Sequence, residues 1–244
     1  MTRLKKNSWI YKKKITHRGF HNELHPENSL SAFRRAIEFG YAIELDVHIL
    51  RDGHIIVFHD DDLFRMTGDD RKIEEVTLED ICELNLKDSN EKIPHLSETL
   101  QLVDGQVPLL IELKNSGDVG VLETKLMSFL NDYKGEVILQ AFSPYRLKWL
   151  LDNEPQIIRG QLSGLHITSL KWYENFLYRN LFFHLLTKPD FVNYEIAGLR
   201  RLPIRLIKFF NVPVFSWTAR SKESYIWGLK YSENVVFEGF SPEI

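Results

Sequence analysis

The chain has 244 residues, of which 43% are hydrophobic and 27% are charged, and 31 Lys and Arg stand against 34 Asp and Glu. This is the composition of an ordinary globular protein, and a net charge of −3 excludes the strong basic field typical of nucleic-acid binding. A single cysteine excludes an internal disulfide framework and a cysteine-based zinc site.

Residues 1–14 form a basic segment that contains six Lys or Arg. The segment lacks the apolar run of a secretory signal, and no later run approaches the length of a membrane span. We therefore expect a cytoplasmic protein without a transmembrane segment. The basic residues are expected to be solvated, with weak contact to an anionic membrane surface as the alternative.

Short apolar or alternating runs recur along the chain, and several lead into segments with helical periodicity. The predicted strands are 15–19, 42–50, 55–59, 108–114, 136–142, 157–163, 191–196, 212–218 and 235–240. Alternating strands and helices indicate an α/β protein with a parallel sheet, and eight such units in this length predict a (β/α)8 TIM barrel. An open, doubly wound sheet is the alternative. No linker or repeat divides the chain, so we expect a single domain, 1–244.

The first predicted helix follows the strand at 15–19. Pro26 and Asn28 lie near its expected start, and Gly40 is its expected stop. Further along, residues 61–107 are longer than one crossover needs and include the polar stretch "KDSNEKIPH". We expect them to form a short insertion after the second βα unit, an extended loop with a helix at 77–84.

Charged side chains alternate with apolar ones in two of the predicted strands. Glu44, Asp46 and His48 share one face of the second strand, and Glu112 and Lys114 share one face of the fourth. In a barrel these faces point inward near the carboxyl ends of the strands, where barrel enzymes carry their sites. Three carboxylates favour a hard divalent cation, Mg²⁺ or Ca²⁺, over zinc. Simple pairing of the acids with Lys114 or an arginine is the alternative.

Two histidines lie at strand ends on the same side as these acids. His17 follows the first strand, with Arg18 beside it, and His59 closes the third. Imidazoles exchange protons near neutral pH, and Arg18 and Lys114 supply the positive charge that a phosphate requires. A metal, two cations and two histidines together predict a site for phosphodiester hydrolysis.

Several blocks of the sequence resemble the glycerophosphodiester phosphodiesterase family. They are "HRG" with "PENSLSAF", "IELDVHILRDGHIIVFHDDDLFRMTG", "LLIELKN" and "VPVFSWT", in the family's order between residue 15 and about residue 218. The resemblance implies a barrel that uses one divalent cation to hydrolyse glycerophosphodiesters, which are deacylated phospholipids, to sn-glycerol 3-phosphate and an alcohol.

The resemblance also implies a role for individual residues, and it leaves other residues without one. It implies that Glu44, Asp46 and Glu112 bind the metal, that His17 and His59 carry out acid–base catalysis, that Arg18 and Lys114 bind phosphate, and that Phe142 and Trp217 line the substrate groove. His48 has no role in that pattern. The ending "SENVVFEGFSPEI" lacks the Thr-Asp pair usual in the family, which puts the rim of the site in doubt.

Other functions remain as alternatives. Lysophospholipase D activity is one, because aromatic residues crowd the helical segment 172–186. Packing of that segment against the barrel is the simpler explanation, and contact with a lipid or membrane surface is the alternative. A non-catalytic barrel that binds lipid or protein is a further alternative. A zinc amidohydrolase is less favoured, because the first strand lacks the His-x-His of that class.

Overall fold

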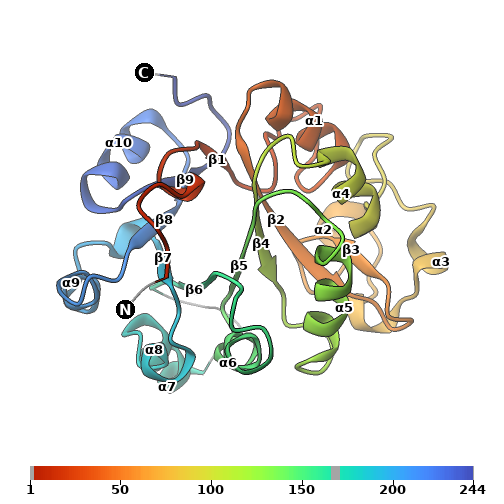
Figure 1. Cartoon of the computed structure of the whole chain (residues 1–244). Helices are drawn as coiled ribbons and strands as arrows, with labels where there is room; N and C mark the ends of the chain where they lie inside the picture. The colour runs from red at the N-terminus through yellow and green to blue at the C-terminus, as the bar shows by residue number, and fades with distance from the viewer. Residues whose placement is uncertain (1–2, 166–170, 244) are drawn as a thin grey trace. The chain divides into compact units, whose positions relative to one another are not determined.

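The computed structural model describes residues 3–165 and 171–243, and the chain packs as two compact units (Figure 1). Thr16–Val137 form the first unit, and the described residues on either side of this range form the second. Residues 1–2 of the predicted basic segment lie outside the described residues. The single-domain assignment stays a prediction.

The centre of the first unit is β2 (Ala42–Ile49), in which every residue is buried. It pairs in parallel with β4 (Leu109–Leu113) and antiparallel with β3 (Ile55–Val57). The short β1 (Ile15–Thr16) also pairs with β2, and the Thr16 hydroxyl donates a hydrogen bond to the carbonyl of the first β2 residue at 3.1 Å. A strand buried on both faces is typical of a sheet covered by helices, so polar side chains on β2 need partners.

Helices flank these strands. α1 (Leu30–Glu38) begins after Ser29, whose hydroxyl accepts a hydrogen bond from a backbone N–H in the first turn, so the helix begins slightly later than Pro26 suggested. It ends before Gly40, which has a φ of 65° and terminates the helix as predicted. α5 (Val121–Leu130) follows β4.

The extended loop predicted over 61–107 is wrong in part, because short helices occupy much of it. They are α2 (Phe64–Thr67), the 3₁₀ helix η2 (Ile73–Glu75), α3 (Leu78–Ile81) and α4 (Leu96–Val103). The helix expected at 77–84 exists as the shorter α3. Met66, Ile73 and Ile81 pack with Ile56 and Phe58 in one buried cluster. The insertion therefore shares a buried core with β3, which a polar sequence stretch did not indicate.

The second unit repeats a strand followed by a helix. Its strands pair in parallel in the order β9-β8-β7-β6-β5, and in Figure 1 its helices lie outside these strands. The strands are β5 (Val137–Ala141), β6 (Arg159–Ser163), β7 (Phe191–Glu195), β8 (Val214–Ala219) and β9 (Val235–Phe237). The helices are η1 (Trp9–Tyr11), α6 (Pro144–Asn153), α7 (Trp172–Arg179), α8 (His184–Thr187), η3 (Ile196–Gly198), α9 (Leu202–Phe209) and α10 (Lys222–Tyr231).

The strand and helix alternation of the two units is that of a (β/α)8 barrel, which confirms the predicted fold class. All nine predicted strands are present, with ends that shift by a few residues. Within the described residues, no helix is both long enough and apolar enough to span a bilayer.

The expectation that helix packing accounts for the aromatic segment 172–186 is wrong. The segment forms two helices, α7 and α8, and in α7 only Asn175 is buried. Trp172 is 82% exposed and Leu185 is 84% exposed. Only part of the helical stripe formed by residues 173, 176, 177, 181 and 185 is covered, since Leu181 is buried whereas Leu185 is exposed.

Candidate active site

Three carboxylates meet inside the first unit. Glu44 and Asp46 are two residues apart on β2, and the parallel register places Asp46 directly opposite Glu112 on β4. All three side chains are buried, and a carboxylate oxygen from each lies within 4.8 Å of the others. The period of two along a strand thus gathers, on one face of a sheet, acids that are far apart in sequence.

The surroundings give the three acids different affinities for protons. Burial and the adjacent carboxylates raise the pKa of Glu44 well above its ordinary value, and burial also raises the pKa of Glu112. Burial disfavours the charge of Asp46 too, but nearby positive groups, Lys114 first among them, more than offset this and hold its pKa low. Buried, mutually repelling carboxylates of this kind favour a cation among them.

The segment between β1 and α1 binds both acids of β2. The backbone N–H of Arg18 donates to Glu44 Oε2 at 3.0 Å, and the amide of Asn28 donates to Asp46 Oδ2 at 2.9 Å. Both Arg18 and Asn28 adopt left-handed backbone conformations, with φ of 53° and 55°. Such conformations are strained for residues other than glycine and cluster at functional sites.

Two positively charged side chains flank the acids. Lys114 Nζ lies 2.9 Å from Glu112 Oε1 and 3.4 Å from Asp46 Oδ1, and Arg18 Nε lies 3.6 Å from Asp46 Oδ2. Despite its burial, Lys114 has a pKa above its ordinary value because the two carboxylates stabilise its charge. Lys114 and Arg18 can therefore balance the acids and also attract an anionic group.

His59 is the end of a chain of charged contacts in the same unit. Its Nδ1 lies 2.6 Å from Asp60 Oδ1, and Asp60 Oδ2 accepts from Arg65 Nε at 2.5 Å. Arg65 Nη2 and Arg18 Nη1 each donate to Glu27 Oε1 at 2.6 Å. The two residues predicted to handle protons and phosphate, His59 and Arg18, are thus joined through three intermediate side chains.

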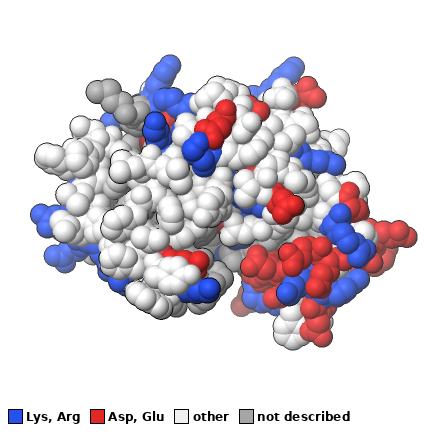
Figure 2. Space-filling view, turned by 90° about the horizontal axis from the view of Figure 1, so that it is seen from below, with Lys and Arg blue, Asp and Glu red and all other residues white. Residues whose placement is uncertain are grey.

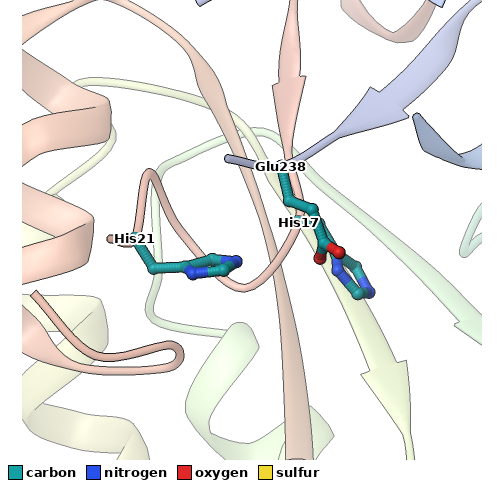
Figure 3. Close-up of side chains that lie close together, drawn as sticks. All are labelled: His17, His21 and Glu238. Carbon is teal, nitrogen blue, oxygen red and sulfur yellow. The ribbon is translucent and has the colours of Figure 1, made fainter. Parts of the chain in front are cut away.

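His17, the other predicted catalytic histidine, is buried and directly follows β1. Figure 3 shows that His17 and His21 both come from the segment after this strand, and a ring nitrogen of each lies within 4.8 Å of the other. Glu238, also labelled in Figure 3, belongs to the second unit, where its carboxylate accepts a hydrogen bond from Arg220 Nε at 2.5 Å. The unusual C-terminal sequence therefore supplies an ion pair.

His48 shares a strand with the acids but has different surroundings. It is fully buried, and burial followed by the charge of Lys114 lowers its pKa to about 3. Its Nε2 lies 3.3 Å from the carbonyl oxygen of His59, so His48 contacts the backbone that carries this predicted catalytic residue. His48 is thus neutral at physiological pH and is suited to holding that backbone in place.

Phe142 and Trp217, the predicted groove residues, lie together in the second unit. Their rings meet edge to face with centroids 5.7 Å apart, and Trp217 Nε1 donates to the carbonyl of Asn193 at 3.2 Å. The pair is half-buried. Its contact with a substrate stays a prediction.

Sequence reasoning gave no role to Glu27, Asn28, Asp60 or Arg65. The motifs "PENS" and "HDDDLFR" contain them, but an acid in a polar loop is most often solvated, and nothing in the spacing indicates that Glu27 contacts Arg65. Glu27 and Arg65 are 38 positions apart in the sequence, and they come into contact only in the folded chain.

The residues present fit a divalent cation. Glu44, Asp46 and Glu112 offer oxygen donors alone, which suit Mg²⁺ and Ca²⁺, and their burial and repulsion disfavour three adjacent charges without a positive partner.

Comparison of the sequence with known proteins identifies the family that it matches. The model of the Glycerophosphoryl diester phosphodiesterase family matches residues 17–237. A glycerophosphodiester phosphodiesterase of Caldanaerobacter subterraneus subsp. tengcongensis is 33% identical over 160 residues, which cover 61% of this chain and 65% of that protein. Human lysophospholipase D is 29% identical over 147 residues, which cover 54% of this chain and 45% of that protein. The chain thus aligns with less than two thirds of the length of either relative.

The fold of this chain is also similar to that of a solved structure. An Oleispira antarctica phosphodiesterase in complex with the product sn-glycerol-3-phosphate matches with a TM-score of 0.78 and 21% sequence identity. The match covers 93% of this chain and 92% of that one. The two proteins share a fold.

Proposed function

The chain belongs to the glycerophosphoryl diester phosphodiesterase family, and from this premise we propose that it hydrolyses glycerophosphodiesters to sn-glycerol 3-phosphate and an alcohol. The observation that carries the proposal is the set of three buried carboxylates flanked by Arg18 and Lys114. Such a set suits a divalent cation together with a phosphodiester, because positive groups remain beside the acids to bind the anion.

We propose that Glu44, Asp46 and Glu112 hold one divalent cation, Mg²⁺ or Ca²⁺. When bound, the cation supplies Lewis-acid polarisation of a phosphoryl oxygen. Arg18 and Lys114 bind the remaining negative charge of the phosphate. The contacts of Arg18 with Glu27 and of Lys114 with Glu112 orient both side chains before substrate arrives.

Each displacement at phosphorus requires two proton transfers. An attacking oxygen, from water or from the neighbouring glycerol 2-hydroxyl, forms a bond to phosphorus and loses a proton, and the bond from phosphorus to the leaving alcohol breaks as that alcohol gains one. Attack by water gives sn-glycerol 3-phosphate directly, whereas attack by the 2-hydroxyl gives a cyclic phosphate, which water opens to sn-glycerol 3-phosphate in a second displacement. We propose that His17 and His59 are the base and the acid. Asp60 accepts from His59 Nδ1, which leaves Nε2 as the ring nitrogen for proton exchange.

The metal dependence can be tested with glycerophosphocholine as substrate. Treatment with a chelator should abolish activity, and Mg²⁺ or Ca²⁺ should restore it. Asp46→Asn should weaken binding of the same cation in isothermal titration calorimetry, whereas Glu38→Gln, a matched loss of charge at an exposed site on α1, should not. Full activity after complete removal of divalent cations would disprove the assignment.

The two histidines can be tested separately from the metal. His17→Ala and His59→Ala should each lower kcat by about 10²–10⁴, the usual contribution of general acid–base catalysis, with cation affinity nearly unchanged. His54→Ala is a suitable control because His54 lies in the turn between β2 and β3 and contacts His95. Wild-type turnover in both histidine variants would refute their catalytic role.

Lysophospholipase D activity is not favoured, because the matching family model and the first relative both carry the glycerophosphodiester description. Comparing hydrolysis of glycerophosphocholine and lysophosphatidylcholine tests this choice. The non-catalytic alternative predicts no hydrolysis of either substrate with any divalent cation. The cytoplasmic location stays a prediction, which cell fractionation can check.

A further inference from the structure

A wide apolar surface covers α7, α8 and α9 in the second unit, and we call it the α7–α9 surface. Its most exposed members are Trp172, Phe182, Leu185, Leu202, Phe209 and Phe210, which are 58–84% exposed. A groove of about 670 Å³ runs between the helices and is lined mainly by apolar side chains. Contiguous exposed apolar surface of this kind marks an interaction site in soluble proteins.

The packing of the second unit leaves these side chains largely outside its core. α9 sends Ile204 into a buried cluster with Leu181 and Tyr194, whereas Leu202, on the same helix, stays outside. Trp172 contacts the exposed ring of Tyr173. Since removing apolar side chains from water is favourable, an outside partner that covered several of them would bind favourably.

The charges around the α7–α9 surface are mostly positive. Residues 171–212 contain seven Lys and Arg and three Asp and Glu, in a chain whose net charge is −3. One of the three acids, Asp190, is buried and pairs with Arg3. Arg200, Arg205 and Lys208 are exposed beside the apolar residues. Figure 2 shows the protein from the side on which α7, α8 and α9 lie in Figure 1; the left part of that view is mostly white, with Lys and Arg at its outer edge and a few acidic residues at its lower edge.

We propose that the α7–α9 surface docks onto anionic phospholipid bilayers, independently of the catalytic proposal. Exposed Trp, Phe and Leu enter the interface between headgroups and acyl chains, while surrounding Arg and Lys bind the acidic headgroups. A second copy of the chain fits less well, because a symmetric dimer would bring the same positive residues of both copies together. The surface thus combines the two attractions that peripheral binding requires.

Sedimentation of the full chain with vesicles tests the proposal. The protein should bind vesicles of phosphatidylcholine with phosphatidylserine much more strongly than pure phosphatidylcholine vesicles. Each Arg near the membrane should strengthen binding about fivefold, so replacing both Arg200 and Arg205 with Gln should weaken binding to these vesicles about 25-fold. Trp172→Ser combined with Phe209→Ser should weaken it without unfolding the protein, because both side chains are largely exposed. Tryptophan emission should shift to the blue on binding, and Trp172→Phe should reduce the shift.

Ile226→Ser combined with Leu229→Ser is the matched control, because it removes exposed apolar side chains from α10 in the same unit. This variant should bind vesicles like the wild type. Absence of binding to the acidic vesicles, or equal weakening by the control, would overturn the proposal. A dimer in sedimentation velocity that dissociates with Phe209→Ser, without vesicle binding, would assign the surface to self-association instead.

Discussion

Glu27→Gln is the most informative single substitution for the candidate site. The side chain is largely buried, and its carboxylate accepts hydrogen bonds from both Arg18 and Arg65. Burial opposes its ionisation, but the hydrogen bonds and charges of the two arginines prevail and lower the pKa of Glu27 to about 2. Glutamine has nearly the same shape, so the variant removes the charge without opening a cavity.

The lowered pKa sets the size of the effect. A decrease from 4.5 to about 2 corresponds to about 3 kcal/mol of folding free energy at pH 7. Because the folded pKa is depressed, this stabilisation is fully present above the unfolded pKa and is lost as the pH falls through the folded pKa. At pH 3.5 about 2 kcal/mol remains. The stability difference between wild type and Glu27→Gln should therefore shrink on acidification.

Urea unfolding followed by circular dichroism at pH 7 and pH 3.5 measures this difference. Glu38→Gln makes the same chemical change at an exposed site and should alter stability by less than about 0.5 kcal/mol. In activity assays, Glu27→Gln should raise KM for glycerophosphocholine because Arg18 loses a partner that orients it. Equal stability of wild type and variant at pH 7, or a difference that does not change with pH, would refute the reasoning.

Three further substitutions test other contacts. Asp60→Asn should lower kcat by on the order of 10–100-fold, because the neutral amide holds His59 Nδ1 less firmly than the carboxylate does. A variant with the kcat of the wild type would contradict this. Lys114→Met should destabilise the cation-free protein by about 3–5 kcal/mol in urea unfolding, because two buried carboxylates lose their partner, and Mg²⁺ or Ca²⁺ should recover part of the loss. Gly19→Ala should lower the free energy of unfolding by about 1–3 kcal/mol, because the φ of Gly19 is 81° and an added Cβ would lie 2.9 Å from the Phe33 side chain. Thermal unfolding measures this loss. A variant as stable as the wild type would show that the backbone around residue 19 shifts to accept the Cβ.

The strands and the acid cluster were predictable because they depend on local patterns. Alternation along β2 and β4 already places Glu44, Asp46 and Glu112 on inward faces, and the parallel register brings them together. The ion pair between Glu27 and Arg65 was not predictable, since it joins the segment before α1 to the short helix α2, and the path of the chain between them depends on the whole unit. The exposure of Leu185 was missed for a related reason, because helical periodicity shows which residues share a face but not what covers it.

The segment between β1 and α1 explains how the acids of β2 are held in fixed positions. The Asn28 N–H donates to the Arg18 carbonyl at 2.9 Å, so the segment closes on itself between its two left-handed residues. Each of these residues then sends one N–H donor to a different acid, Glu44 or Asp46. The strain of two left-handed residues, about 1–3 kcal/mol each, is therefore offset by hydrogen bonds to buried carboxylates. These hydrogen bonds orient the carboxylates of Glu44 and Asp46, as accurate metal and substrate binding requires.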